Sequence, residues 1–559
     1  MVRRIGKVER IARRAFLHVV LAMGSFVFAI PFIWLFSTSC KVPDEMYPPK
    51  WVPQIPEGVA SSPYIRIREN EKPVRPVRVR EEDWERLAGP VEAAITERLV
   101  SMQGRLPGLY GQYLREPDLA KGVFNRVLKR APDHLFEKNE LVVTSWFGGE
   151  VTDEIVYEVF DMVYRRASLS DVVLHGWDMS VEYPTEGGYI PWTVAKGSNV
   201  QLVDRKTGLR RASKELHYSF ENQDSFTVQA IVPMNMAPEN LKKVVVSNHA
   251  DRSWHEVNCT LEMAGVRYES VQKGFLGSDQ WQEWAWQFPS EMDHSVETKN
   301  WLRIREAGPS EFREQGRLRV TLDFNRALRP KAVANKYMFN YREVLRMIPV
   351  TMYLRNSLVL VVLNVLGQIV GSSLVAFSFA RLRWPARDFC FFLVLATLMI
   401  PPQVTMIPVF LIFKNLGWYN TLKPLWVVSF FGSAFYIFLL RQFMRSIPGD
   451  LEDSAKIDGC GYLGIYWRII MPLIKPALAT IGIFTSLAVW NDFMGPLIYV
   501  NDQALYPLSL GLFALKVFKT GDYGLMMAGA VMMTLPIIIL FFVAQREFIQ
   551  GITLTGMKG

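Results

Sequence analysis

The sequence predicts an α-helical integral membrane protein that carries a large insert of mostly β-structure. The chain has 559 residues, which is too many for one ordinary domain. From about residue 345 to its end the chain is mostly apolar, whereas residues 53–335 are polar and one apolar segment precedes them. A soluble domain could not bury so much apolar surface in that order, but a membrane protein with a soluble insert can.

Several segments are long and apolar enough to cross a membrane, because a helix of about 20 apolar residues spans the hydrocarbon core of a bilayer. One precedes the polar region and the others follow it; they comprise residues 16–37, 356–380, 389–413, 422–440, 472–500 and 524–544. Proline removes a helical N–H group, so we expect bends at Pro401, Pro402, Pro408, Pro496 and Pro536. Such bends serve either to line a transport pathway or only to pack the helices.

Lysine and arginine residues indicate which side of the membrane each loop occupies. Even numbers of spans separate their clusters, so both termini and these loops are cytoplasmic by the positive-inside rule. The insert at 38–345 then lies outside, because long domains cross regardless of their charge. The first segment could instead be a cleaved signal peptide, although its length and Pro31 favour a retained anchor. The clusters are Arg3, Arg4, Lys7, Arg10, Arg13 and Arg14; Arg381, Arg383 and Arg387; Arg441, Arg445, Lys456, Arg468 and Lys475; and Arg546 and Lys558.

The chain carries no motif of a metal centre or an enzyme. Its cysteines, Cys40, Cys259, Cys390 and Cys460, lie far apart without a CxxC pair, so we expect no metal or other cofactor. Cys40 and Cys259 could form a disulfide or remain as two free thiols, and the sequence leaves both alternatives open. The chain has no GxxxxGK[ST] phosphate loop, no HExxH and no GxSxG sequence. It therefore cannot bind ATP through such a loop, and we assign no catalytic residue.

A polar stretch at residues 452–476 separates the fourth and fifth apolar segments on the cytoplasmic side. Its first part favours a helix, and Gly459 can adopt a positive φ, as the residue after a helix often must. An amphipathic segment at 462–471 then leads into the fifth apolar segment. The sequence therefore predicts a short helix, a turn and a second helix that project a knob into the cytoplasm. The small side chains of Ser454 and Ala455 would let another protein approach this knob closely.

The knob resembles the EAA loop of ABC-importer permeases, and the run from Leu451 to Val500 is most similar to their carbohydrate-uptake, maltose-permease-like branch. The matching residues are Asp453-Ser454-Ala455, Asp458-Gly459, Ile469 and Met471-Pro472, with FNYREVL at 339–345, FARLRWPARD at 379–388, MIPPQVTMIP at 399–408 and QREFIQGITLTGMKG at 545–559. The resemblance covers residues 1–52 and 335–559. Asp-Ser-Ala stands here in place of Glu-Ala-Ala, and Cys460 in place of a usual alanine, but the turn glycine is retained.

This resemblance implies the type I ABC importer permease fold, with six transmembrane helices in the inner membrane. In that family the loop sits in a groove of a separate ATPase subunit, so Asp453, Ser454, Ala455, Asp458 and Gly459 are expected to form the coupling contact. The resemblance also implies a second permease subunit, two ATPase subunits, an extracytoplasmic solute-binding protein and a carbohydrate substrate, and no nucleic acid. The alternative is a membrane-anchored extracellular sugar-binding or sensory protein whose spans have lost transport.

Four polar residues at membrane depth are candidates for the solute path. Asn364 and Gln368 lie one turn apart in the second segment, and Asn491 and Asp492 are adjacent in the fifth. Neutral hydrogen-bonding groups suit a sugar, whereas an ionisable group costs about 2.5–3.5 kcal/mol to insert, so Asp492 should face protein or water. Such residues equally often hold helices together.

The resemblance does not extend to the insert. Residues 53–139 are predicted to be partly helical, because Trp84, Leu87, Val91, Ala94, Ile95 and Leu99 share one helical face. Residues 140–330 are predicted to form a β-sandwich-like domain, and 331–559 the permease core. The predicted strands are LVVTSWF (141–147), DVVLHGWDMSVEY, NVQLVD, HYSFENQDSFTVQAIV, KKVVVS, EVNCTLEM, WLRIRE and RLRVTLDF, with 152–166 ambiguous between helix and strand.

Three tryptophans in the insert, Trp281, Trp284 and Trp286, form either a surface for a sugar or part of a packed core. On a strand, Trp284 and Trp286 would share a face. Packing is favoured because buried aromatic residues are commoner than sugar platforms. Docking of the solute-binding protein is a further role open to the insert.

Overall fold

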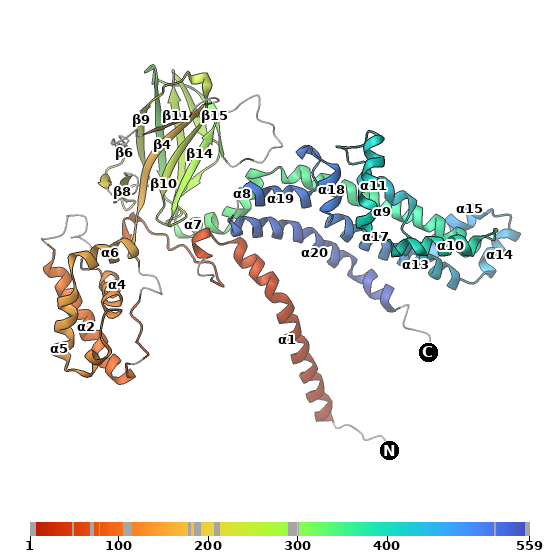
Figure 1. Ribbon diagram of the computed structural model, residues 1–559, viewed down its shortest axis with the longest axis horizontal. Coiled ribbons are helices and arrows are strands. Elements are labelled where there is room, and N and C mark those ends of the chain that lie inside the picture. The colour runs from red at the N-terminus through yellow and green to blue at the C-terminus, as the bar shows by residue number, and fades with distance from the viewer. Residues whose placement is uncertain are drawn as a thin grey trace. The chain divides into compact units, whose positions relative to one another are not determined.

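The protein divides into two compact units (Figure 1). The first, called the membrane unit because it holds the long apolar helices, comprises Met1–Pro53, Glu291–Asn300 and Tyr337–Gly559. The second, the insert unit, comprises Gln54–Ser290 and Trp301–Lys336. The computed structural model describes residues 7–46, 50–66, 72–77, 79–103, 114–176, 180–183, 192–205, 213–288, 299, 301–518 and 521–553, so the predicted cytoplasmic residues Arg3, Arg4 and Lys558 lie outside the described residues.

Within the described residues, four helices of the membrane unit are long and apolar enough to cross a membrane. They are Arg14–Ser39, Val350–Arg381, Pro424–Ser446 and Tyr523–Val543. Two further pairs are bent: Arg387–Met399 and Pro402–Asn415 meet at 101°, and Tyr462–Leu473 and Lys475–Trp490 at 76°. The predicted number of six therefore requires each bent pair to cross as one span.

The described helices of the membrane unit include long helices and short connecting helices and turns. They are α1 (Lys7–Ser39), η1 (Pro43–Glu45), α8 (Phe339–Met347), α9 (Val350–Arg381), α10 (Arg387–Ala396), η5 (Thr397–Met399), α11 (Pro402–Asn415), α12 (Pro424–Val427), η6 (Val428–Phe431), α13 (Ala434–Ser446), α14 (Asp450–Ile457), α15 (Tyr462–Ile465), the π-helical turn η7 (Tyr466–Ile470), α16 (Met471–Leu473), α17 (Lys475–Trp490), α18 (Met494–Tyr499), η8 (Gln503–Leu505), α19 (Leu508–Phe518) and α20 (Tyr523–Thr553). Helix α7 (Arg329–Tyr337) connects the insert unit to α8.

The sharper bend lies where the sequence predicts one, at Pro401 and Pro402. Ile400 and Pro401 are extended, with ψ of 117° and 131°, because a residue before proline is disfavoured in the helical region. Helix α11 restarts at Pro402, where the first turn does not use the missing N–H group. The predicted bend at this position is confirmed.

Helix α9 satisfies the broken backbone of its neighbours with buried polar side chains. We call Asn356, Ser357, Asn364 and Ser372 the polar seam of α9; each is at most 5% exposed. Backbone groups that a break removes from a helix need partners from protein where lipid offers none. The bonds are Asn356 Nδ2 to Ala504 O (2.9 Å) and Tyr506 O (3.1 Å), Leu508 N to Ser357 Oγ (2.8 Å), Asn364 Nδ2 to Leu425 O (3.0 Å), and Ser433 N to Ser372 Oγ (3.2 Å).

The chain just after α1 and the start of α8 are joined to each other inside the membrane unit. The side-chain amide of Asn340, at the start of α8, donates to the carbonyl oxygens of Ser39 (2.9 Å) and Lys41 (2.8 Å), just after α1. The Ser39 and Tyr341 hydroxyls are also 2.7 Å apart. The end of α1 and the start of α8, which the insert separates in the sequence, are therefore held together, and α1 packs against α20.

The first part of the insert unit is a small helical bundle of α2 (Glu81–Ser101), α4 (Pro117–Leu128), η3 (Asp133–Glu137), α5 (Glu140–Glu150) and α6 (Asp153–Val163). Leu87, Val91, Ile95 and Leu99 form the buried face of α2, which confirms the predicted helix. The predicted strand at 141–147 is wrong, because that run lies in α5. Its β-branched residues favour a strand in isolation, but Val143 and Phe147, one helical turn apart, are fully buried in the bundle core.

Within the described residues, the second part of the insert unit is a 14-stranded β-sheet whose main path follows the order β1-β8-β4-β10-β14-β15-β12-β11-β16-β9-β6, and β2 and β3 form a separate pair. We call this sheet the sandwich, because the two halves of its path contribute residues to one core. Its pairs are antiparallel except β14 with β15. The strands are β1 (Ser61–Ser62), β2 (Tyr64–Ile65), β3 (Tyr164–Arg165), β4 (Ala167–Gly176), β5 (Ser180–Tyr183), β6 (Thr193–Lys196), β7 (Val200–Arg205), β8 (Ser213–Ser219), β9 (Ser225–Pro233), β10 (Leu241–His249), β11 (Glu256–Met263), β12 (Val266–Ser270), β13 (Gly274–Phe275), β14 (Trp281–Gln287), β15 (Leu302–Pro309) and β16 (Arg317–Asn325), with η4 (Pro238–Asn240) before β10.

Alternating residues from both layers of the sandwich form one core. Strands β9 and β16 bury every second residue, as period-2 patterning requires. Val246 of β10 and Trp286 of β14 come from one layer, and Val228 of β9 and Leu322 of β16 from the other. Cys259 of β11 is buried in this core and unpaired, so the Cys40–Cys259 disulfide left open by the sequence is absent.

A substitution at Gly371 should test the close contact between α9 and η6. A Cβ atom there would lie 2.3 Å from the carbonyl oxygen of Phe430 and 2.9 Å from the nitrogen of Gly432, both in the backbone. Gly371→Ala should therefore lower the free energy of unfolding by about 1–3 kcal/mol. In the control Gly482→Ala, the new Cβ meets only Val365 Cγ1 at 3.6 Å. Equal melting temperatures of the two purified variants in detergent would contradict this contact.

Candidate coupling site

The predicted knob is a helix, a glycine turn and a second helix. Helix α14 ends in a Schellman motif, in which the Gly459 N–H donates to Lys456 O (3.0 Å) and the Cys460 N–H donates to Ala455 O (2.8 Å). Gly459 has φ +79°, a conformation that glycine adopts without the strain of a side chain. The positive φ and the turn predicted at this glycine are confirmed. Helix α15 and the π-helical turn η7 then lead towards α17.

The five predicted coupling residues lie together on this corner, called the coupling knob (α14 to α15). Asp453, Ser454, Asp458 and Gly459 are exposed, and Ala455 is half-buried. Asp453 accepts a hydrogen bond from Lys456 Nζ at 2.8 Å, which lowers the pKa of the Asp453 carboxyl. The Ser454 hydroxyl donates to Asp450 O, one turn earlier in the same helix (2.8 Å). The knob therefore presents short polar side chains on a hydrogen-bonded helical turn.

Large apolar side chains surround these polar groups, a feature that the sequence reasoning missed. Ile457 is 86% exposed and Leu463 is 71% exposed, with Leu451, Tyr462 and Trp467 also exposed. A cluster of exposed apolar residues beside polar ones is typical of a protein-binding surface. In the sequence, this exposure is indicated only by the position of Ile457 and Leu463 on either side of the predicted turn. Side chains beside the end of a helix are often exposed.

The predicted solute-path residues separate into two kinds. Asn364 is buried, donates to Leu425 O and accepts from the Ser429 hydroxyl, so it joins α9 to α12 and η6. Gln368, one turn further along α9, is half-buried and accepts from Ser372 (3.2 Å).

Asn491 and Asp492, after α17, are both exposed. The Asn491 amide donates to Leu487 O in the last turn of α17 (2.9 Å), and an oxygen of Asp492 accepts from the Gly495 N–H (3.0 Å). These two side chains can therefore meet a solute or another subunit, whereas Asn364 is engaged by the protein itself.

Two of the three insert tryptophans are in the core. Trp284 and Trp286 share the inward face of β14 and are buried, whereas Trp281 at the start of the strand is 43% exposed. Trp281 meets the His249 ring edge-on at 5.6 Å, so it lies beside a polar end of the sandwich.

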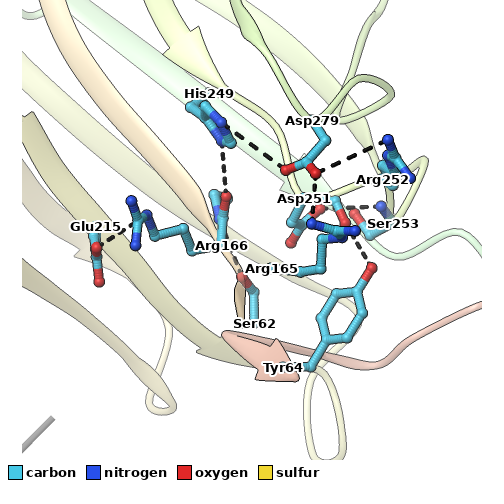
Figure 2. Close-up of polar contacts among 11 residues, drawn as sticks. Ser62, Tyr64, Arg165, Arg166, Glu215, His249, Asp251, Arg252, Ser253 and Asp279 are labelled. Carbon is cyan, nitrogen blue, oxygen red and sulfur yellow. Dashed lines mark hydrogen bonds and ion pairs between the residues drawn. The ribbon is translucent and has the colours of Figure 1, made fainter. Parts of the chain in front are cut away.

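That end of the sandwich holds a buried charged cluster, shown in Figure 2. Arg165 of β3 pairs with Asp279 at 2.6 Å, and their side chains are 3% and 7% exposed. Arg252 and His249 also lie within 4.0 Å of Asp279 (Figure 2). The carboxylate of this aspartate therefore connects β3 to the loop after β10.

The second aspartate of the cluster, Asp251, is fully buried. Its carboxylate accepts from the Tyr218 hydroxyl (2.7 Å) and the Ser253 N–H (3.0 Å), and its carbonyl oxygen accepts from the Tyr64 hydroxyl (2.6 Å). These partners join β2, β8 and the loop after β10. The cluster therefore holds the N-terminal strands of the insert to the sandwich.

Comparison with known proteins assigns the membrane unit to a family. Residues 367–552 match the family described as binding-protein-dependent transport system inner membrane component. The arabinooligosaccharides transport system permease protein AraQ of Halalkalibacterium halodurans is 37% identical over 203 residues, which cover 36% of this chain and 71% of that protein. The chain belongs to this family of permeases.

Other relatives cover the same part of this permease. The polygalacturonan/rhamnogalacturonan transport system permease protein YtcP of Bacillus subtilis is 34% identical, over 37% of this chain and 77% of that protein. One chain in the crystal structure of a bacterial ABC transporter involved in the import of the acidic polysaccharide alginate is 26% identical, with a TM-score of 0.33, and the match covers 37% of this chain and 78% of that chain.

The family assignment settles the class of the protein. This permease is a helical, multi-pass protein of the inner membrane with a separate large β-sheet region, and it is not itself an enzyme. Permeases of this class work with an ATPase and a substrate-binding protein. The matched residues include the whole coupling knob, Gln368, Asn491 and Asp492, and they exclude the insert and Asn364.

Asp279→Asn should show that the charged cluster holds the insert together. The substitution leaves the Arg165 guanidinium buried without its closest counter-charge, so the insert should lose about 3–5 kcal/mol of stability. Asp204→Asn is a matched control, because Asp204 pairs with Lys214 but is 56% exposed and should lose at most about 1 kcal/mol. Urea titration in detergent, followed by tryptophan fluorescence, measures both; equal effects would contradict a structural role for the cluster.

Proposed function

We propose that this permease translocates a sugar or oligosaccharide across the inner membrane as a subunit of an ABC importer. The names of AraQ and YtcP, which refer to arabinooligosaccharides and to polygalacturonan/rhamnogalacturonan, support a carbohydrate substrate. The neutral amides of Gln368 and Asn491 fit such a solute, because they can donate to and accept from hydroxyl groups without the cost of a buried charge. Asp492 lies beside Asn491 on the same exposed turn.

The observation that carries this proposal is the coupling knob. It combines an exposed helix, a turn stabilised by two backbone hydrogen bonds, and the exposed side chains of Ile457 and Leu463. A cytoplasmic ATPase subunit would cover these apolar groups, with Asp453, Ser454, Ala455, Asp458 and Gly459 at the contact. Transport then follows from ATP-driven closure of two ATPase subunits against this permease and a second permease subunit.

The same proposal assigns each part of the chain to a side of the membrane. Each bent pair crosses as one span, which gives six spans with both termini and the coupling knob in the cytoplasm. The insert then lies outside, where the solute-binding protein delivers the substrate. Arg381, Arg387, Arg441, Arg445 and Lys456 support this orientation, because they lie around the knob on the side where positive charge is retained.

Gly459→Pro should uncouple the importer without preventing membrane insertion. Proline fixes φ near −65°, which is incompatible with the +79° of Gly459, and it removes the N–H that bonds to Lys456 O. The ATPase subunits should no longer co-purify in full amount, and transport-coupled ATP hydrolysis should be abolished.

Two alanine variants distinguish the effect of the positive φ at the turn from the effect of adding a side chain. An added Cβ atom would meet open space at both Gly459 and Gly461, but Gly461 has φ −73°. Gly459→Ala should strain the turn by roughly 1–2 kcal/mol and weaken co-purification, whereas Gly461→Ala should leave it unchanged. Full coupling in Gly459→Pro would remove the knob from the proposed contact.

A further inference from the structure

The last residue of α9 holds the coupling knob against the membrane core. Arg381 Nε lies 2.9 Å from Glu452 Oε1 in the first turn of α14, and the two side chains are only 11% and 9% exposed. Nη2 of the same guanidinium donates to the carbonyl oxygens of Met444 and Ile447, the latter at 2.7 Å. One side chain from α9 therefore contacts both sides of the corner at which α13 turns into α14.

The chemistry of this corner explains why an arginine stands there. The end of α13 leaves carbonyl groups without intrahelical partners and carries partial negative charge, and Glu452 adds a full negative charge nearby. A guanidinium offers several N–H donors in one plane and a delocalised charge, so Nη2 can donate to the two carbonyl groups while the charge lies beside the carboxylate. Because the site is nearly buried, loss of the arginine would leave the two carbonyl groups without this donor and Glu452 without its counter-charge.

A second arginine connects helices α9, α10 and α13 in the same region. Arg441 of α13 donates from Nε to the Phe379 carbonyl oxygen of α9 (3.3 Å), and its guanidinium lies 4.0 Å from the ring centroid of Phe391 in α10. Helices α9, α10 and α13 are thus joined near Arg381. On the other side of α14, the Asp453–Lys456 pair is exposed. One face of α14, with Glu452, therefore contacts α9, and the other face, with Asp453 and Lys456, is exposed.

We propose that Arg381 is a positioning residue that transmits movement of the coupling knob into α9. This inference rests on the proposed function, because it supposes that an ATPase subunit moves the knob. A shift of α14 pulls on Glu452, and Arg381 carries that shift into α9. The polar seam of α9 then carries it to the helix breaks, through Asn364 to Leu425 and through Ser372 to Ser433.

Paired spin labels on α14 and α9 test this inference in the full complex with its partner subunits. Asp450→Cys and Leu366→Cys place one label on the first residue of α14 and one on an exposed side of α9. Cys40, Cys390 and Cys460 are replaced by serine, whereas Cys259 is buried and stays. The distance between the labels is measured without nucleotide and with ADP and vanadate trapped after ATP hydrolysis.

The distance should be the same in both nucleotide states when Arg381 is present, because α14 and α9 move together. In Arg381→Gln the distance should shift and broaden in the vanadate-trapped state, and ATP hydrolysis should continue without transport. Arg387→Gln is the matched control, since Arg387 lies on the same side but pairs with Asp388, whose side chain is 73% exposed. This control should behave as the unsubstituted protein.

Glu452→Gln provides a second, nearly isosteric variant that keeps the proposal testable if Arg381→Gln does not fold. It should reproduce the shift, and the double variant should be no worse than Arg381→Gln alone, because Glu452→Gln removes one of the interactions that Arg381→Gln also removes. An unchanged distance in Arg381→Gln and Glu452→Gln, with the ATPase subunits still bound, would overturn the inference alone. Failure of the ATPase subunits to co-purify with the unsubstituted permease would instead overturn the proposed function.

Discussion

A lipid bilayer offers no hydrogen-bond partner to a broken helix, so each break in the membrane unit has to be satisfied by protein. Helix α9 supplies these partners. Its side chains at 356, 357, 364 and 372 bond to backbone groups beside η8, α19, α12 and α13, and Arg381 does the same for the end of α13. Helix α9 is therefore the element against which the interrupted helices are fixed. A movement of α9 without these neighbours would expose unpaired backbone groups at several places.

The coupling knob combines two surfaces with opposite properties. Its inner side is closed, because Glu452 is buried against Arg381. Its outer side is open, with Ile457 and Leu463 exposed and the turn closed by two backbone hydrogen bonds. This division suits an element that transmits movement, because one side is fixed to the membrane core and the other is available to a partner. The insert has an independent structure, with its own bundle core and sandwich core, and the family assignment does not reach it.

The sequence was sufficient where the deciding interactions are local. The glycine turn after α14, the bend at Pro401 and Pro402 and the buried face of α2 each depend on a few neighbouring residues. The strand predicted at 141–147 is wrong because its β-branched residues suit a strand equally well. Only the packing of Val143 and Phe147 in the bundle favours a helix. Asn364 was ambiguous for a similar reason, since its acceptor on Leu425 lies 61 residues away. Arg381 was visible only as one of several cytoplasmic arginines, because its partners Met444, Ile447 and Glu452 are brought to it by the fold.

The central claim is that the coupling knob lies at the cytoplasmic face. Side-specific labelling of Cys460 tests it most directly, since this half-buried thiol lies directly after the turn and can be made the one reactive cysteine by replacing Cys40 and Cys390 with serine. A membrane-impermeant maleimide should label Cys460 in inverted membrane vesicles stripped of ATPase subunits and leave it unlabelled in intact spheroplasts. Labelling in intact spheroplasts would contradict the account.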